Sequence, residues 1–160
     1  MIKLIALLFT ITVANANIFP FFLPDEGSSF NHHLQTLLKN SHSEVVIVTS
    51  SMNYPSLTKS IIHSLSHGVH LKFIVTKLSN DPLRFVAYQG VDLYSYTPRT
   101  ISDTLILIDS THICHISGAF DEKIMGSSVS TAWCTDDTAI ILKTDKNIQT
   151  LLQRSSPYLQ

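Results

Sequence analysis

The sequence predicts an α/β fold in which a mixed, mostly parallel sheet is covered by helices on both faces. Short β-branched and apolar runs, typical of buried strands, alternate with stretches whose apolar residues recur at helical spacing. The strand at 45–48, the helical stripe from Leu57 to Leu65 and the strand at 69–75 follow one another closely. This order indicates a βαβ unit with two parallel strands and a right-handed crossover.

The N-terminus has the pattern of a bacterial secretory signal peptide. The positive charge of Lys3 precedes an apolar run at 4–13 and a small-residue cleavage site at 14–16. The run is shorter than the roughly 20 residues that a permanent membrane span takes, and an uncleaved anchor is the alternative. We therefore expect residues 1–16 to be removed and residues 17–160 to form one exported domain, periplasmic or secreted.

Composition narrows the function classes. The formal net charge is −1, and no basic block or stripe is present, so nothing indicates nucleic-acid binding by charge. The two cysteines, Cys114 and Cys134, both lie in the exported part. An even pair in an oxidising compartment favours a disulfide, with two buried free thiols as the alternative.

The remaining elements are predicted from local patterns. Residues 17–24 are apolar, aromatic and interrupted by prolines, which suits an edge strand or an extended lead-in. Apolar residues from Phe30 to Leu38 share one helical face, which includes His33 as a packing residue. Further strands are predicted at 91–96, 105–108, 112–116 and 139–142, a short helix is predicted to start at 81–82, and a last helix at 145–152.

The strand at 105–108 is the most informative stretch. It is an unbroken apolar run that ends in Asp109, as a strand buried on both faces would. A polar turn at 110–111 leads to the alternating strand at 112–116, so the two are predicted to form a hairpin. Residues 118–125 have no regular pattern.

The order of these segments resembles the phospholipase D superfamily, in particular its small secreted, nuclease-like members with a single catalytic motif. The resemblance covers nearly all of the mature chain and implies a phospholipase D-like fold. The superfamily signature is H-x-K-x4-D followed by a G-S-x-N turn. In it, the histidine is the nucleophile, and the lysine and asparagine bind phosphate oxygens. The segments that resemble the superfamily are Phe22–Gly27, Ser43–Tyr54, His67–Val75, Gly90–Leu93 and Gly126–Ser128.

Only part of this signature is present. Asp109 matches the aspartate, but Ser102 stands in place of the histidine and Thr104 in place of the lysine. A serine hydroxyl does not replace an imidazole without a base beside it, and threonine carries no charge. The resemblance therefore implies that both the nucleophile and the phosphate-binding cation are lost.

The turn that follows the motif is ambiguous. Gly126, Ser127 and Ser128 match its first residues, and Val129 stands where the asparagine is expected. The spacing from the motif is longer than in the superfamily, so residues 118–119 are a rival assignment.

Three residues near the motif could replace the missing groups, namely His112, His115 and Lys123. Residues three apart in a strand point to opposite faces, so the two histidines are poorly placed as a pair. We expect no metal and no cofactor. Lys123 could supply a cation, although its charged surroundings are also typical of a solvated loop.

We therefore expect an exported phospholipase D-like protein that lacks the standard phosphodiesterase activity and acts as a binding or partner subunit. Because members with one motif form their site from two chains across a two-fold axis, the resemblance implies a homodimer or a heterodimer with an intact relative. The alternative is an active phosphodiesterase or nuclease, acting on DNA or phospholipid through non-standard residues. Charge indicates neither ligand.

Overall fold

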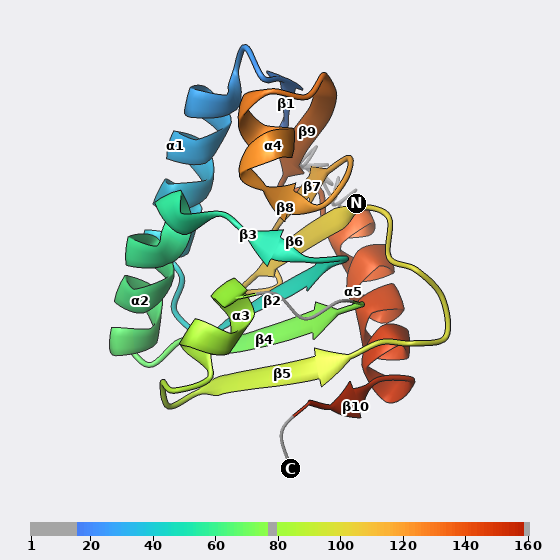
Figure 1. Ribbon diagram of the computed structural model, residues 1–160. Helices are drawn as coiled ribbons and strands as arrows, with labels where there is room; N and C mark the ends of the chain where they lie inside the picture. Colours follow the sequence, from blue (N-terminus) through green and yellow to red (C-terminus); the bar gives the residue numbers. More distant parts are fainter. Residues whose placement is uncertain (1–15, 77–79, 159–160) are drawn as a thin grey trace, which may run out of the picture.

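The computed structural model describes residues 16–76 and 80–158 and is built on one large sheet (Figure 1). The strands of this sheet are β1 (Ile18–Leu23), β2 (Glu44–Thr49), β4 (His70–Val75), β5 (Val91–Ser95), β6 (Thr104–Ile108), β7 (His112–Ile116), β9 (Ser130–Thr135) and β10 (Ser156–Pro157). Their order across the sheet is β1-β9-β7-β6-β2-β4-β5-β10. A second, two-stranded sheet pairs β3 (Met52–Asn53) with β8 (Phe120–Asp121).

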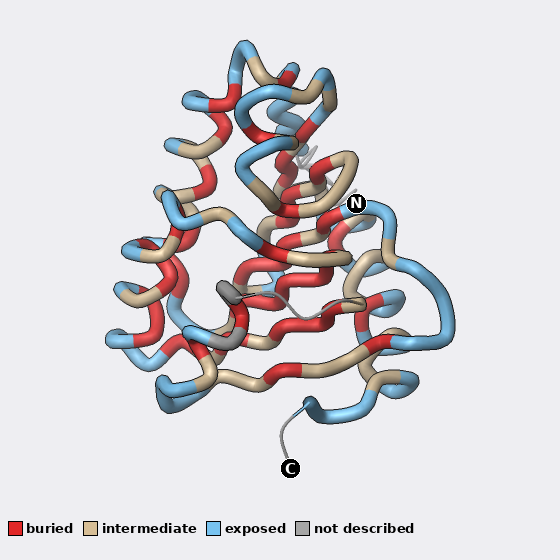
Figure 2. The backbone as a smooth tube through the Cα atoms, in the orientation of Figure 1, coloured by how far each residue is buried: buried red, intermediate tan, exposed pale blue. Residues whose placement is uncertain are grey.

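Helices cover both faces of the large sheet, as the sequence predicts. They are α1 (Gly27–Lys39), the 3-10 turn η1 (Pro55–Leu57), α2 (Thr58–Ser66), α3 (Asn80–Phe85), α4 (Glu122–Gly126) and α5 (Thr138–Gln153). In Figure 1, α1, α2 and α3 lie on one side of the sheet and α5 lies on the other. Figure 2 shows the buried residues concentrated along the central strands, between the two helical layers.

The central strand β2 separates two apolar clusters. Successive side chains of a strand point to opposite faces, so Val45 and Ile47 pack with the buried residues of α1 and α2. Val46 and Val48 pack on the other face, with Ile141 and neighbouring residues of α5. This double burial explains why the strand is an uninterrupted apolar run in the sequence.

The mixed sheet and the predicted βαβ unit are confirmed. β2 pairs with β4 in parallel, and β4 pairs with β5 in parallel. The other described ladders of the large sheet are antiparallel, so parallel pairing is less frequent than the sequence predicts. For the β6–β7 ladder the reason is connection length, because these strands are joined by a short turn, and a short turn can join only antiparallel strands.

The C-terminal region corrects one prediction. Residues 139–142 form no strand; they lie in the first part of α5, whose start is capped by the carboxylate of Asp137. The Asp137 Oδ1 atom accepts the backbone N–H of Ile140 at 2.8 Å. The last long strand is instead β9, upstream. A short apolar run fits either a buried strand or a helix, and here the helix continues to residue 153.

The two cysteines form the predicted disulfide. Cys114 and Cys134 face each other across the antiparallel β7–β9 ladder, and both are buried. A disulfide of this kind is consistent with a periplasmic or extracellular protein. The predicted signal peptide lies, except for its last residue, outside the described residues. No helix in the described part of the chain is long and apolar enough to cross a membrane.

Candidate functional site

The residues of the degenerate motif lie at opposite ends of β6. Because β6 runs antiparallel to β2, Thr104 lies beside the C-terminal end of β2 and Asp109 beside its N-terminal end. At the usual rise of a strand, these two residues are about 17 Å apart. The structure therefore does not bring Asp109 together with Ser102 and Thr104.

Asp109 fastens the start of β2 to the β6–β7 turn. Its Oδ1 atom accepts the backbone N–H groups of Ser43 at 2.9 Å and Glu44 at 3.0 Å, and also the Ser43 hydroxyl. Its Oδ2 atom accepts the N–H of His42 at 2.8 Å. Partial burial acts to raise the pKa of this carboxyl, but the hydrogen bonds favour its charged form and hold the pKa below the usual value. Asp109 therefore stabilises this end of the sheet.

The side chain of Thr104 is enclosed by the protein and has no access to solvent. Its side chain is fully buried, and its hydroxyl donates to the Gly118 carbonyl oxygen at 2.8 Å. The hydroxyl oxygens of Thr49 and Thr104 lie 2.8 Å apart, within hydrogen-bond distance. Where the superfamily signature has a lysine, this chain therefore has a neutral group that joins β6, β2 and the residues after β7.

Of the two segments that could be the signature turn, residues 118–119 form the one that contacts Thr104. Gly118 lies two residues after the end of β7, and its carbonyl oxygen accepts the Thr104 hydroxyl; Ala119 follows it. The other segment, Gly126–Ser128, closes α4: both of its serine N–H groups donate to the carbonyl oxygen of Lys123. Lys123 itself is exposed on α4. Within the described residues, no hydrogen bond links Gly126–Ser128 to Ser102 or Thr104.

The two histidines of β7 point to opposite faces, as the sequence predicts. His112 lies on the α1 side, near His33, whose pKa is lowered mainly by burial and further by His112 and His32. His115 lies on the α5 side and stacks on Trp133, with ring centroids 5.2 Å apart. No three side chains of His, Cys, Asp or Glu gather to hold a metal in the part of the chain that the structure describes.

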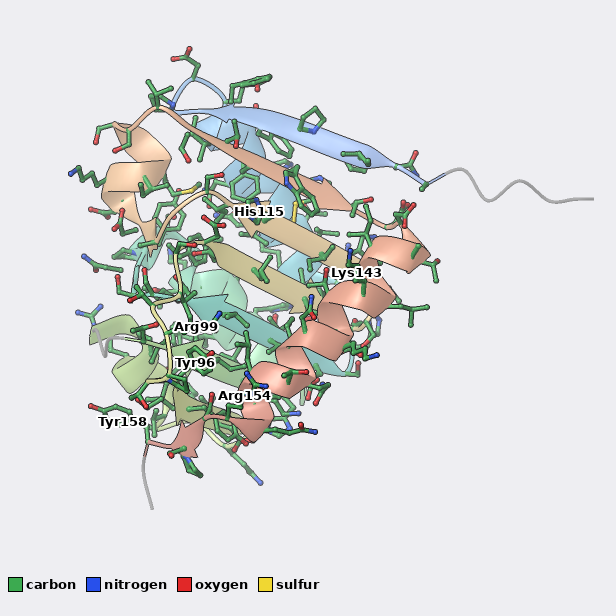
Figure 3. All side chains as sticks on the ribbon, turned by 90° about the vertical axis from the view of Figure 1, so that its right-hand side faces the viewer. Tyr96, Arg99, His115, Lys143, Arg154 and Tyr158 are labelled. Carbon is green, nitrogen blue, oxygen red and sulfur yellow. A yellow bond between two sulfur atoms is a disulfide. The ribbon has the colours of Figure 1, made fainter. Side chains whose placement is uncertain are left out.

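Ser102 and His115 line one cavity of about 370 Å³ on the α5 side. Two charged residues that the sequence analysis missed, Arg99 and Asp103, line the same cavity. Their closeness to Ser102 in the sequence, within three positions, could have indicated them. A loop, however, has no periodic pattern that shows which of its side chains point into a cavity. Figure 3 shows Arg99, Tyr96 and His115 on the face that α5 covers. The remaining lining residues are Val48, Thr100, Ile101, Leu105 and Leu151.

The cavity does not contain a nucleophile with a base. The Nε2 atom of His115 lies 3.6 Å from Asp103 Oδ2, and its Nδ1 atom is buried with no partner among the described residues. A serine nucleophile needs one imidazole nitrogen for its own proton while the other faces the carboxylate. In the part of the chain that the structure describes, neither nitrogen of His115 hydrogen-bonds to Ser102.

The fold is that of phospholipase D-like proteins. The chain is similar to the solved structure of NucT from Helicobacter pylori, with a TM-score of 0.80 and 16% identity over 90% of this chain and 100% of that chain. It is also similar to Nuc, a phospholipase D family member from Salmonella typhimurium, with a TM-score of 0.75 and 12% identity over 91% and 100%.

A third structure with this fold is TrmBL2, an archaeal chromatin protein, which has a TM-score of 0.64 and 10% identity over 88% of this chain and 54% of that chain. No family model matches the sequence, and no curated protein matches it. At these identities, the structural likenesses establish the fold alone.

Replacement of Asp109 by alanine is predicted to destabilise the protein. Loss of hydrogen bonds to a charged acceptor lowers the free energy of unfolding by about 2–3 kcal/mol at neutral pH. The folded pKa lies below the unfolded value, so this stabilisation is fully present above the unfolded pKa and is lost as the pH falls through the folded pKa. Denaturant unfolding of native protein and variant across acidic pH measures the difference.

The matched control is Asp109→Asn, since asparagine also tolerates the positive φ of 51° at this position. It should lose less stability than Asp109→Ala. A difference between native protein and Asp109→Ala that stays constant down to strongly acidic pH would contradict the assignment.

Replacement of Thr104 by valine is also predicted to be destabilising. The change keeps the shape but leaves the Gly118 carbonyl and the Thr49 hydroxyl without this partner, which lowers the free energy of unfolding by about 1–3 kcal/mol. Chemical denaturation measures it, with Thr104→Ser, which keeps the hydroxyl, as the control. A valine variant as stable as the native protein would show that the hydrogen bonds of the Thr104 hydroxyl do not stabilise the protein.

Proposed function

We propose that this chain is an exported protein of phospholipase D-like fold that performs no phosphohistidine chemistry and acts by binding, as a binding or partner subunit. The observation that carries the proposal is that the side chain of Thr104 is buried and has no access to solvent. A phosphate-binding cation has to reach the substrate, whereas this side chain is neutral, fully buried and hydrogen-bonded inside the protein.

The missing nucleophile supports the same proposal. Ser102 is exposed, and no described residue accepts its proton. An unactivated hydroxyl is a weak nucleophile at neutral pH. The alternative, an active phosphodiesterase or nuclease with non-standard residues, would need His115 to take the proton of Ser102. The Nδ1 atom of His115, which does not face Asp103, is buried and has no hydrogen-bond partner among the described residues.

A binding role is compatible with the fold, because one fold supports many functions. TrmBL2, which shares the fold, is described as a chromatin protein with a novel mode of DNA binding. For this chain, DNA is not the ligand that we propose, since the formal net charge is −1 and no basic stripe is present.

A partner surface is proposed beside the segment Gly126–Ser128. Phe22 and Val129 are apolar yet 65% and 96% exposed, and both line a cavity of about 720 Å³ together with Ser117 and Ser127. Exposed apolar side chains beside a concave surface are typical of an interface. We propose a second chain of the same fold, identical or intact in its motif, as the partner.

The mature chain is predicted to turn over neither an activated aryl phosphodiester nor plasmid DNA, with or without a chelator. The physical reason is the absence of both an activated nucleophile and an accessible cation. The Ser102→Ala variant is the matched control, and its rate should equal that of the native chain. Cleavage by the native chain that disappears in Ser102→Ala would overturn the proposal in favour of an unusual hydrolase.

Protein isolated gently from its native source is predicted to sediment as a dimer or with a partner of the same fold. Val129→Asp should weaken this association, because a charge would be buried in the interface. Leu142→Asp is the control, since Leu142 is 65% exposed on α5 and does not line that cavity. A native protein that sediments as a monomer with no partner would contradict the proposal.

A further inference from the structure

The cavity under α5 is separate from the position of Thr104. Ile106 and Ile108 of β6 belong to the cluster on the α1 side, whereas Leu105 and Leu107 pack on the α5 side. Leu105 lies directly opposite His115 in the β6–β7 ladder, and both line the cavity. The cavity therefore opens on the face of the sheet that the motif lysine would not occupy.

One wall of the cavity carries a free positive charge. No described residue forms a hydrogen bond or ion pair with the guanidinium of Arg99, which lines the cavity. Asp103, the nearest acid in sequence, lies beside His115 instead, at 3.6 Å. An unpaired guanidinium in a concave site is suited to bidentate binding of a carboxylate or phosphate. The exposed hydroxyl of Ser102 provides a second donor beside it.

The segment that carries Arg99 and Ser102 is held in place. The backbone N–H of Ile101 donates to the hydroxyl oxygen of Thr76 at 3.1 Å, just after β4. This bond fixes the middle of the loop between β5 and β6. It holds the backbone that carries Arg99 and Ser102, whose side chains are exposed.

Apart from Thr100, Asp103 and His115, the rest of the cavity lining is apolar or aromatic. Its floor is formed by Val48, Leu105 and Leu151, and Tyr96 contributes an aromatic wall. Its volume of about 370 Å³ lies in the range of small-molecule sites. A bare anion would leave this surface uncovered, whereas an anion with an apolar group would cover it.

We propose that this cavity binds a compact anion attached to an apolar body, namely a phosphate or carboxylate on an aromatic or short aliphatic group. Arg99 holds the anion, Ser102 donates a further hydrogen bond, and the floor residues cover the apolar part. The inference rests on the proposed binding function and names its ligand class.

The test uses the whole mature chain and titrates phenyl phosphate, benzoate, inorganic phosphate and phenol by NMR. At least one of the first two should bind, and the stronger of them distinguishes a phosphate from a carboxylate ligand. Phenol and inorganic phosphate should bind about tenfold more weakly or not at all, because each lacks one half of the recognised group.

The decisive variant is Arg99→Gln, which should weaken binding about tenfold or more through loss of the charge-assisted pair. Its control is Arg154→Gln, because Arg154 follows α5 on the same face, as Figure 3 shows, but does not line the cavity. The control should bind as the native chain does. Equal binding by Arg99→Gln and the native chain, equal weakening by both variants, or no binding of phenyl phosphate and benzoate would overturn the inference.

This experiment separates the inference from the proposed function. If the native chain cleaves phosphodiesters while Arg99-dependent binding is observed, the proposed function fails and the ligand site stands. If the chain neither cleaves phosphodiesters nor binds either probe through Arg99, the ligand site fails and the proposed loss of catalysis stands.

Discussion

The pairing of β6 with β2 is the constraint on which the rest of the molecule depends. Both ends of β6 are fixed by hydrogen bonds: Asp109 binds the chain before β2, and Thr104 binds Thr49 at the end of β2. Between these ends, side chains of both strands fill the two apolar clusters. The helical layers pack on a sheet whose centre is thereby held in register.

This arrangement explains how the aspartate of a catalytic signature stands in a chain without the histidine and lysine. Asp109 lies at the far end of the strand and stabilises the start of β2, so its contribution does not depend on catalysis. The side chain of Thr104 lies in the protein interior, where its hydroxyl is hydrogen-bonded. The contacts of Asp109 and Thr104 that stabilise the fold therefore do not depend on the chemistry of the signature.

The sequence predicts the central strands, the βαβ unit and the β6–β7 hairpin because burial on both faces leaves uninterrupted apolar runs. It fails at 139–142, where a four-residue apolar run does not distinguish a strand from the first turn of a helix. For the site, the sequence identifies Ser102 and His115, but it misses Arg99 and Asp103. Only the folded chain brings the loop between β5 and β6 against the α5 side of β7.

The most direct test of the central claim is the mass of the intact protein after it is mixed with an activated aryl phosphodiester and quenched in alkali. A chain without an activated nucleophile forms no covalent intermediate, so the mass of the protein should stay unchanged. An added phosphoryl group on Ser102 or on any histidine would contradict it, because it would show that this fold has kept a nucleophile by another route.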